Sequence, residues 1–391
     1  MLRVLTLSTL FPDASRPTLG PFVERQTLGL AAHPDVALKL VSPRGLPPWP
    51  LSLHPRYRAL AAVKAREDWK GLDCYRPRFL ALPGTGGGFA ARGVVRALTP
   101  LLTRIRRDFA FDVIDAEFFF PDGPAAIALG KHFGVPVSIK ARGADIHYWG
   151  TQAATAAQVI AAGQAADGML AVSAALKEDM AVLGMPADRI RVHYTGVDLS
   201  LFKPLDRGAT KHALGVSGPL IVTVGALIPR KRQHLVIDAL AQLPGTTLAL
   251  IGKGEDKTKL REQASALGLG DRVRLLGAMP HAEIARWLGA ADVMCLPAAS
   301  EGLANAWVEA LACGTPIVIT DVGGARELID RPEAGRLIEP QAEAIARAIR
   351  AVLANPVDPQ KVRACAERFT WEANTAALYD HLAGLVAARL G

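Results

Sequence analysis

Two glutamates eight positions apart carry the strongest chemical signal in the sequence. Glu301 lies in a polar turn after an apolar run that ends at Leu296, and Glu309 lies about two turns further along, in the helix that follows. This helix is predicted to begin near residues 303–305 and to stop at Gly314, a residue type that favours helix C-termini. Because carboxylates accept hydrogen bonds from hydroxyl groups, Glu301 could hold a sugar and Glu309 a ribose.

The start of this predicted helix is a candidate anion site. The backbone N–H groups of Ala304, Asn305 and Ala306 would lack intrahelical acceptors and would point out of the helix end. The helix dipole favours negative charge there, so a nucleotide diphosphate could bind. The alternative for a glutamate pair on a helix is a solvated surface, but small and apolar flanking residues argue against it.

A short basic run follows a second buried strand pattern, at residues 220–224. Gly225 ends that pattern, and Arg230 and Lys231 follow Pro229 in the next loop. Charge-assisted hydrogen bonds from these cations could neutralise a diphosphate leaving group, which is a large catalytic contribution in a site that excludes water. A solvated basic loop is the alternative, and the position at a strand end favours the phosphate interpretation.

The elements that would position these residues alternate between strand and helix. This alternation predicts an α/β fold with parallel sheets and crossover helices, in two successive series. Ligands of such sheets bind beyond the carboxyl ends of the strands, so two facing domains would place a cleft between them. The apolar runs are 4–7, 36–41, 113–114, 135–139, 169–172 and 190–192, then 220–224, 248–251, 273–275, 293–296 and 316–319.

Composition limits the classes of function. The chain has 391 residues, half of them hydrophobic, which suits two domains that each bury a core. Its net charge of +8 is uneven, because residues 1–110 contain 17 Lys and Arg against 7 Asp and Glu. The excess indicates either a solvated surface or attraction to an anionic membrane or phosphorylated acceptor. No recognition-helix, zinc-finger or RNP-type pattern occurs, so we expect no nucleic-acid partner.

The cysteines and the N-terminus bear on location. The four cysteines form no CxxC pair and have no histidine cluster nearby, which indicates neither a zinc site nor a disulfide framework and fits a reducing cytosol. The first apolar run is short and runs into Pro12 and Asp13 with no small-residue cleavage site, so we interpret it as a strand, not a signal peptide. We expect a cytoplasmic protein, located at the inner face of a membrane.

The segment from Ser300 to Pro316 resembles the Glu-x7-Glu motif of family 4 glycosyltransferases, which have the GT-B fold of two facing Rossmann-like domains. A lone Glu-x7-Glu pattern would be a weak signal, but the resemblance extends over nearly the whole chain. It is carried by further motifs at residues 20–22, 194–198, 224–231, 251–254, 276–279, 290–293 and 321–327.

The resemblance implies a domain plan. Residues 1–198 would form the acceptor-side domain, residues 199–370 the nucleotide-sugar-binding domain, and residues 371–391 a helix that packs back on the first domain. The segment from Gly45 to about Gly88 contains six prolines and is expected to be an irregular loop region that faces the acceptor.

The resemblance also implies roles for the basic run and the glutamates. Lys231 and Arg230 would neutralise the leaving diphosphate, in the loop after Gly225 that resembles the family's phosphate-binding loop. Glu301 would hold the donor sugar at its 3- and 4-hydroxyls, and Glu309 would bind the nucleotide ribose.

Backbone groups would complete the donor site by the same resemblance. The amides of residues 304–306 would contact phosphate or sugar, and the backbone around Met279 would contact the base. Gly20 would let an N-terminal loop approach the donor closely, because glycine has no side chain to clash.

Two positions depart from the family pattern. Ala226 stands where the family usually has Arg, so one phosphate contact is missing or comes from Arg230 or Arg232. Arg142 stands where many members have His, and a subset of the family carries Arg-Gly-x-Asp here. Arginine cannot act as a general base, but it can bind a hydroxyl, phosphate or carboxylate. The alternative for Arg142 is an ion pair with Asp145.

The resemblance implies a hexosyltransferase (EC 2.4) that retains anomeric configuration by front-face attack. The donor would be a UDP- or GDP-sugar, and the acceptor a glycan, glycolipid or lipid-linked molecule in cell-surface polysaccharide synthesis. No Asp-x-Asp motif occurs, so we expect no metal and no other cofactor.

Two other functions stay open. A nucleotide-sugar 2-epimerase uses the same fold, although its typical motif pattern is absent from this sequence. A non-catalytic protein that binds anions or membranes through its basic N-terminal region would bind in a salt-dependent way and would not bind a sugar nucleotide.

Overall fold

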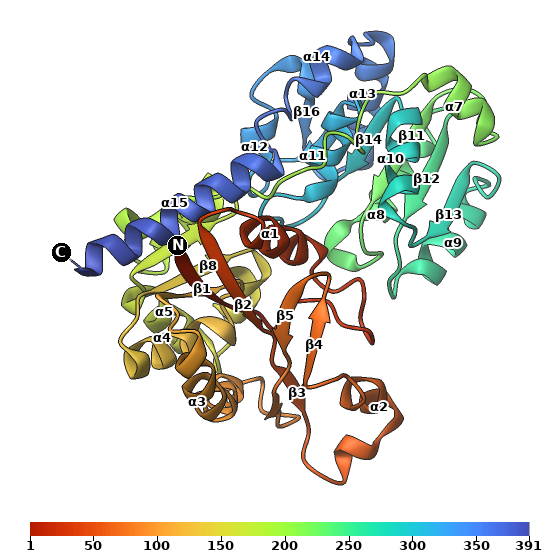
Figure 1. Cartoon of the computed structure of the whole chain (residues 1–391). Helices are drawn as coiled ribbons and strands as arrows, with labels where there is room; N and C mark the ends of the chain where they lie inside the picture. The colour runs from red at the N-terminus through yellow and green to blue at the C-terminus, as the bar shows by residue number, and fades with distance from the viewer. Residues whose placement is uncertain (391) are drawn as a thin grey trace. The chain divides into compact units, whose positions relative to one another are not determined.

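A computed structural model describes residues 1–390, which divide into two compact units (Figure 1). Unit 1 consists of Met1–Gly196 together with the C-terminal segment from Trp371 onwards, and unit 2 is Val197–Thr370. The first boundary lies two residues before the junction expected from the sequence.

Unit 1 is built on an eight-stranded sheet in the order β10-β9-β8-β7-β1-β2-β5-β4. All neighbouring strands are parallel except β4 and β5, which form an antiparallel pair. The strands are β1 (Leu2–Leu7), β2 (Val36–Val41), β4 (Arg66–Trp69), β5 (Leu72–Tyr75), β7 (Val113–Ala116), β8 (Val137–Ala141), β9 (Gly168–Ala171) and β10 (Ile190–Val192). The expected α/β class is therefore confirmed.

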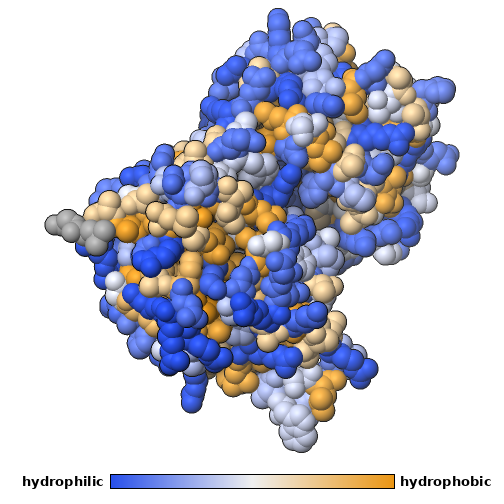
Figure 2. All heavy atoms as spheres, in the orientation of Figure 1, coloured by the Kyte–Doolittle hydropathy of each residue, from blue (hydrophilic) through white to orange (hydrophobic). Residues whose placement is uncertain are grey.

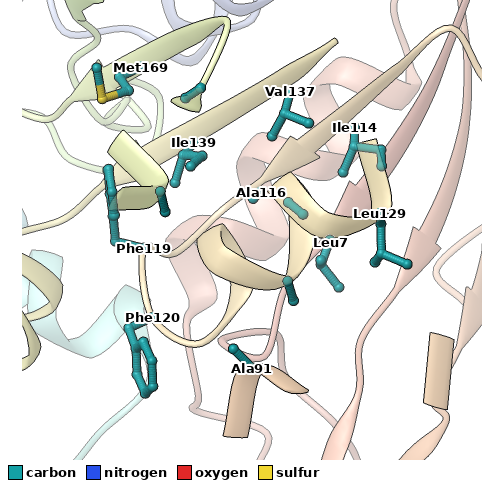
Figure 3. Close-up of a cluster of buried hydrophobic side chains, with 14 of the residues drawn as sticks. Leu7, Ala91, Ile114, Ala116, Phe119, Phe120, Leu129, Val137, Ile139 and Met169 are labelled. Atoms are coloured by element: carbon teal, nitrogen blue, oxygen red, sulfur yellow. The ribbon is translucent and has the colours of Figure 1, made fainter. Parts of the chain in front are cut away.

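Helices cover both faces of this sheet. One face packs against α3 (Ala90–Asp108) and α4 (Asp122–Phe133), and Figure 3 shows side chains of this core. The opposite face is buried against α1 (Pro21–Ala31) and α15 (Trp371–Leu390). The remaining helices of unit 1 include α5 (Ala156–Ala165) and α6 (Ala174–Val182).

The alternation of side chains along the strands explains how the two faces separate. In β1, Leu5 and Leu7 point into the core on the α3 side, whereas Val4 belongs to the cluster under α15. Leu378 and Leu382 of α15 complete that second cluster and are fully buried. Each buried leucine stabilises the fold by about 1.5–3 kcal/mol, so the C-terminal helix is an integral layer of unit 1.

The expectation of an irregular loop over residues 45–88 was wrong. This segment contributes β4 and β5 to the main sheet, and β3 and β6 pair as a separate two-stranded sheet. β5 lies beside β2 through the partners Leu40↔Cys74 and Val41↔Tyr75. Leu72 and Cys74 are buried, which is the period-two pattern of a strand, but the pattern is short and stands among prolines and glycines. The other elements there are β3 (Arg44–Leu46), η1 (Leu51–Leu53), α2 (Pro55–Ala61) and β6 (Arg78–Leu80).

Unit 2 has a six-stranded, fully parallel sheet in the order β13-β12-β11-β14-β15-β16. The order reverses between β11 and β14, which pair although two strands separate them in sequence. The strands are β11 (Leu220–Val224), β12 (Thr247–Ile251), β13 (Val273–Gly277), β14 (Val293–Leu296), β15 (Ile317–Thr320) and β16 (Gly335–Ile338). In an open α/β sheet, such a reversal leaves a crevice at the carboxyl ends of the two strands.

Helices of unit 2 connect successive parallel strands as crossovers, and the principal ones are α8 (Gln233–Leu240), α9 (Lys257–Ala266), α10 (His281–Ala290) and α11 (Asn305–Ala312). Helix α13 (Ala342–Ala354) follows the last strand, β16. Shorter helices are α7 (Arg207–Ala213), α12 (Ala325–Leu328) and α14 (Pro359–Arg363).

The docking of α15 predicts a pH-dependent stability. His381 of α15 is buried beside the hydroxyl of Ser138, at 3.1 Å, and burial lowers the pKa of His381 to about 4. The unfolded chain binds a proton near pH 6.5, so the neutral histidine stabilises the fold fully above that pH. The stabilisation is lost as the pH falls from about 6.5 towards 4. His381→Gln should flatten the dependence of the free energy of unfolding on pH in this window, measured by urea denaturation.

The matched control is His132→Gln on α4, where the histidine is exposed. This variant should keep the wild-type slope. An unchanged slope in His381→Gln would mean that His381 does not contribute to the acid sensitivity.

Candidate functional site

The carboxyl ends of β11 and β14 bring the predicted residues of unit 2 together. Gly225 follows β11, and the loop beyond it forms a short 3-10 turn, η4 (Pro229–Lys231). The loop after β14 carries Glu301 and leads into α11. Because β11 and β14 are neighbours in the sheet, residues 70 positions apart in sequence meet at one edge.

A compact charged group forms at this edge. The ammonium group of Lys231 donates to Oε1 of Glu301, and Nη1 of Arg230 lies 3.4 Å from the same oxygen. The Lys231 and Glu301 side chains are only 12% and 9% exposed. A backbone bond of 2.8 Å from Ala299 N–H to the carbonyl of Arg230 joins the two loops. Two cations thus share one carboxylate, which leaves one positive charge in excess.

Glycines form the floor beside this group. Gly225, Gly252 and Gly277 stand at the carboxyl ends of β11, β12 and β13. The N–H of Gly225 donates to the Ile251 carbonyl and that of Gly252 to the Gly277 carbonyl, each at 2.9 Å. A Cβ on Gly252, whose φ is +154°, would overlap the carbonyl oxygen of Gly225. A Cβ on Gly225 would lie 3.7 Å from Cε of Lys231. Close packing therefore requires glycine at position 252, whereas a Cβ at position 225 would make an ordinary contact with the Lys231 side chain.

Helix α11 begins at this edge as expected. It runs from Asn305 to Ala312, and the residue before it, Ala304, provides no side-chain cap for the first N–H groups. Trp307 is fully buried and anchors the helix in the core, whereas Ala306 and Glu309 are partly exposed. The first turn of α11 therefore presents uncapped amides next to the charged group, and its dipole favours an anion.

The turn after β15 holds the Glu301 loop in place. Gly324 N–H donates to the carbonyl of Gly302 at 2.7 Å. Gly323 has a φ of +51°, and a Cβ there would overlap the carbonyl oxygen of Glu301. Glycine at position 323 is thus required by close packing beneath Glu301, while Gly324 contributes a backbone N–H.

Two predicted residues lie apart from the charged group. Met279 is half-buried in the turn after β13, which is two strands away from β11 in the sheet. Gly20 belongs to unit 1, where it precedes α1 with a φ of +60°, and a Cβ there would overlap the carbonyl oxygen of Leu10. This local packing alone requires glycine at position 20, so its approach to a donor stays a prediction.

Arg142 also belongs to unit 1, at the carboxyl end of β8. Its guanidinium group forms an ion pair with the carboxylate of Glu117, donates to the Glu117 carbonyl at 2.9 Å, and lies over the Phe22 ring. The alternative interpretation, an ion pair between Arg142 and Asp145, is wrong. The Asp145 carboxylate instead accepts backbone N–H groups of Arg142 at 2.9 Å and Gly143 at 2.8 Å, because it caps this turn.

The sequence did not point to the buried polar network behind Arg142. Gln26 of α1 donates to Glu117 and accepts from Lys140 of β8 at 2.6 Å. The Lys140 amine lies 2.6 Å from Nδ1 of His193. The other nitrogen, Nε2, donates to the Asn374 carbonyl in α15 at 2.8 Å, which fixes the tautomer. The network runs without a gap from α15 to Arg142.

Burial governs the ionisation of this network. It lowers the pKa of Lys140 and that of His193 well below their usual ranges, and nearby cations add to both effects. Burial also raises the pKa of Asp115, one residue before the end of β7, and the neighbouring Glu117 raises it further. The signal available in the sequence was polar residues inside apolar strand patterns, at Asp115 and Lys140.

Two family models match most of the chain. The model described as Glycosyl transferases group 1 matches residues 209–369, and the model described as Glycosyltransferase Family 4 matches residues 64–201. Each match falls largely within one structural unit, and the first contains the charged group at β11 and β14. The chain belongs to the family 4 glycosyltransferases.

Similar proteins agree with this family. A Bacillus subtilis (strain 168) protein assigned to teichuronic acid biosynthesis, the glycosyltransferase TuaC, is 29% identical over 89% of this chain and 88% of its own length. A D-inositol 3-phosphate glycosyltransferase of Mycobacterium bovis is 35% identical, over 50% of this chain and 44% of its own length.

Solved structures of other glycosyltransferases share the fold, which is GT-B. Anabaena HepE in complex with UDP has a TM-score of 0.76 at 20% identity, covering 98% of this chain and 100% of its own. Sucrose-phosphate synthase from Thermosynechococcus elongatus has a TM-score of 0.78 at 22% identity, covering 99% and 100%.

Two features are absent from residues 1–390. No helix in this part of the chain combines the length and hydropathy needed to cross a membrane. Within the same residues, no three His, Cys, Asp or Glu side chains gather in a way that could hold a metal ion.

The Arg142–Glu117 pair should be important for the stability of unit 1. The two side chains are 6% and 1% exposed, so Glu117→Ala would leave a buried guanidinium without its carboxylate. Removing one partner of such a pair costs about 3–5 kcal/mol, which urea denaturation would measure. Glu117→Gln, which keeps the acceptor oxygen, should lose less. If Glu117→Ala and Arg142→Met were each as stable as the wild type, the pair would be dispensable for stability.

Proposed function

We propose that this protein is a retaining hexosyltransferase (EC 2.4) that moves a sugar from a nucleotide-diphosphate donor to a glycan or lipid-linked acceptor. The observation that supports this most strongly is the group of Lys231, Arg230 and Glu301 beside the uncapped start of α11. The cations and the free amides could bind the phosphates of a sugar diphosphate, and the carboxylate could bind hydroxyl groups of its sugar.

In the proposed complex, the diphosphate takes over the hydrogen bond that Lys231 donates to Glu301 and the ion pair that Arg230 forms with the same carboxylate. The excess positive charge then stabilises the leaving diphosphate as its negative charge develops. The Glu301 oxygens, released from the cations, accept hydroxyl groups of the sugar. Both partners already lie at the same sheet edge, which limits the reorganisation needed on binding.

The nucleotide would extend from the start of α11 across the sheet edge. Glu309, about one turn further along α11, accepts the ribose hydroxyls, and the backbone at Met279 contacts the base. The structures of Anabaena HepE with UDP and with UDP-glucose support a nucleotide-sugar donor and favour UDP over GDP. Since Lys231 and Arg230 supply positive charge that neutralises the phosphates, we propose that the transfer needs no metal ion.

Retention would follow from front-face attack, in which the leaving phosphate oxygen accepts the proton of the acceptor hydroxyl. Arg142 cannot accept that proton, because an arginine stays protonated. Its proposed role is to bind a hydroxyl, phosphate or carboxylate of a substrate, with its guanidinium fixed by Glu117. The relative assigned to teichuronic acid biosynthesis supports an acceptor in cell-surface polysaccharide synthesis.

Loss of Lys231 should affect activity far more than stability. Lys231→Ala removes the best-placed cation on the diphosphate, and loss of one such group lowers kcat by about 100- to 1000-fold. Glu309→Ala should also reduce activity strongly, through the ribose contact. The measurement is nucleotide release from a donor in the presence of acceptor, together with the thermal midpoint of each variant.

Lys257→Ala is the matched control, since Lys257 is an exposed lysine of α9 in the same unit. It should keep wild-type turnover. Unchanged turnover in Lys231→Ala would contradict the assignment of the site, and an inverted anomeric configuration in the product, read by NMR, would contradict retention. Conversion of the donor to its 2-epimer without acceptor would instead identify an epimerase.

Nucleotide binding should be selective and independent of metal. Ligands that bind only the folded state raise its stability, by about 2.7 kcal/mol at a concentration 100 times Kd. We expect a rise in thermal midpoint with UDP or a UDP-sugar, a smaller one with GDP or ADP, and no change in these shifts on adding EDTA. Loss of the shift with EDTA would show that a metal ion takes part in holding the diphosphate.

A further inference from the structure

Exposed apolar side chains gather in one part of unit 1. Among the described residues, eleven large hydrophobic side chains are markedly exposed, and six of them fall between positions 49 and 89. Trp49 is 78% exposed and Leu53 is 63% exposed. The other four are Leu51, Leu80, Leu82 and Phe89. Such a concentration marks an interaction surface, whereas single exposed hydrophobics need no explanation.

These six residues lie on neighbouring elements. Strands β3 and β6 pair in parallel, and Ala81 N–H donates to the Leu46 carbonyl at 2.8 Å, so the segments that follow both strands leave the pair at the same end. The start of α3 packs on β6, since a Cβ on Gly93 would lie 2.9 Å from the Leu80 carbonyl oxygen. Figure 1 shows β3 and α2 at the projecting end of unit 1, and Figure 2 shows apolar and hydrophilic side chains together there. We call residues 45–64 and 77–107 the basic apolar face.

The charge of this face has a single sign. Residues 45–64 and 77–107 contain nine lysines and arginines and no aspartate or glutamate. One carboxylate, Asp108, directly follows the second range. Between the ranges, Glu67 pairs with Arg76, and Asp73 pairs with Lys39 and Arg66. Nine cations with one adjacent carboxylate leave this face with a large net positive charge.

A hollow adjoins the exposed apolar residues. It has a volume of about 500 Å³ and lies between α3, α4 and α5. Arg92 and Arg96, one turn apart on α3, line it together with Gln158, and Gly88 at its rim precedes the exposed Phe89. Within residues 1–390, no carboxylate forms an ion pair with either arginine. The hollow thus offers two guanidinium groups to an anion beside an apolar contact.

We propose that the basic apolar face docks on the surface of an anionic lipid bilayer. Trp49, Leu51 and Leu53 enter the interface between headgroups and acyl chains, where aromatic and aliphatic side chains are favoured. The arginines bind lipid phosphates, and the hollow between Arg92 and Arg96 receives one of them. Apolar insertion and electrostatic attraction together give a stable but reversible attachment.

The unbalanced charge decides between a bilayer and a second copy of the chain. A symmetric dimer would place this face against itself, and its cations would oppose each other without any carboxylate between them. An anionic bilayer supplies both the missing negative charge and an apolar layer. The proposal does not depend on the identity of the donor, since all of its residues lie in unit 1 and outside the charged group at β11 and β14.

Sedimentation with vesicles tests the proposal on the full chain. Wild-type protein should sediment with vesicles of phosphatidylcholine mixed with phosphatidylglycerol and stay in solution with phosphatidylcholine alone. Arg92→Gln/Arg96→Gln should weaken binding by about fivefold for each arginine. Trp49→Ser/Leu53→Ser should reduce it by a similar or larger factor, and added salt should weaken the wild type.

Matched controls remove the same residue types elsewhere. Val182→Ser, at an 87% exposed position, and Arg261→Gln, on α9, should bind vesicles as the wild type does. Equal binding by the face variants and the wild type would overturn the proposal, and so would wild-type protein that stays in solution with anionic vesicles. A dimer that Trp49→Ser/Leu53→Ser dissociates would show that a second copy covers the face. Nucleotide binding measured in parallel keeps failure of this proposal separate from failure of the proposed transferase.

Discussion

The pairing of β11 with β14 is the constraint on which the candidate site depends. Because the sheet order reverses there, the loops after the two strands diverge around a common crevice and bring Lys231 to Glu301. Glycine at position 252 allows close backbone packing along the same edge. The buried Trp307 anchors α11, whose first amides complete the crevice. The charged side chains are therefore positioned by the sheet and not by each other.

Unit 1 uses polar residues at the ends of its strands in a different way. The Arg142–Glu117 pair is almost fully buried, and it continues through Gln26, Lys140 and His193 into the C-terminal helix. Every member has a partner, so the network can be kept inside the unit at little cost, whereas loss of any one member would leave a buried polar group unsatisfied. Rigidity of this kind suits a residue that must present a guanidinium group in a fixed orientation.

Much of this arrangement could be predicted from local patterns. The apolar runs 36–41, 220–224 and 293–296 match β2, β11 and β14 at both ends. β11 and β14 are continuously buried strands, and β2 is buried at both of its ends. The start of α11 and its stop before Gly314 also followed from local rules. What failed depends on pairing over long distances. β5 is a strand only because β2 lies beside it, and the partner of Arg142 stands on the neighbouring β7 end, 25 residues away.

Unit 1 is formed by two segments that unit 2 separates in the chain, and this affects folding during synthesis. Unit 2 is one continuous stretch of chain and can fold as soon as it leaves the ribosome. Unit 1 is begun first, yet part of its second core layer and the carbonyl that orients His193 come from α15, which follows all of unit 2 in the chain. Until α15 is added, the apolar face around Val4 and Leu170 is covered by α1 alone. The nascent N-terminal unit therefore waits through the synthesis of all of unit 2, and this interval is the one in which chaperone protection matters most.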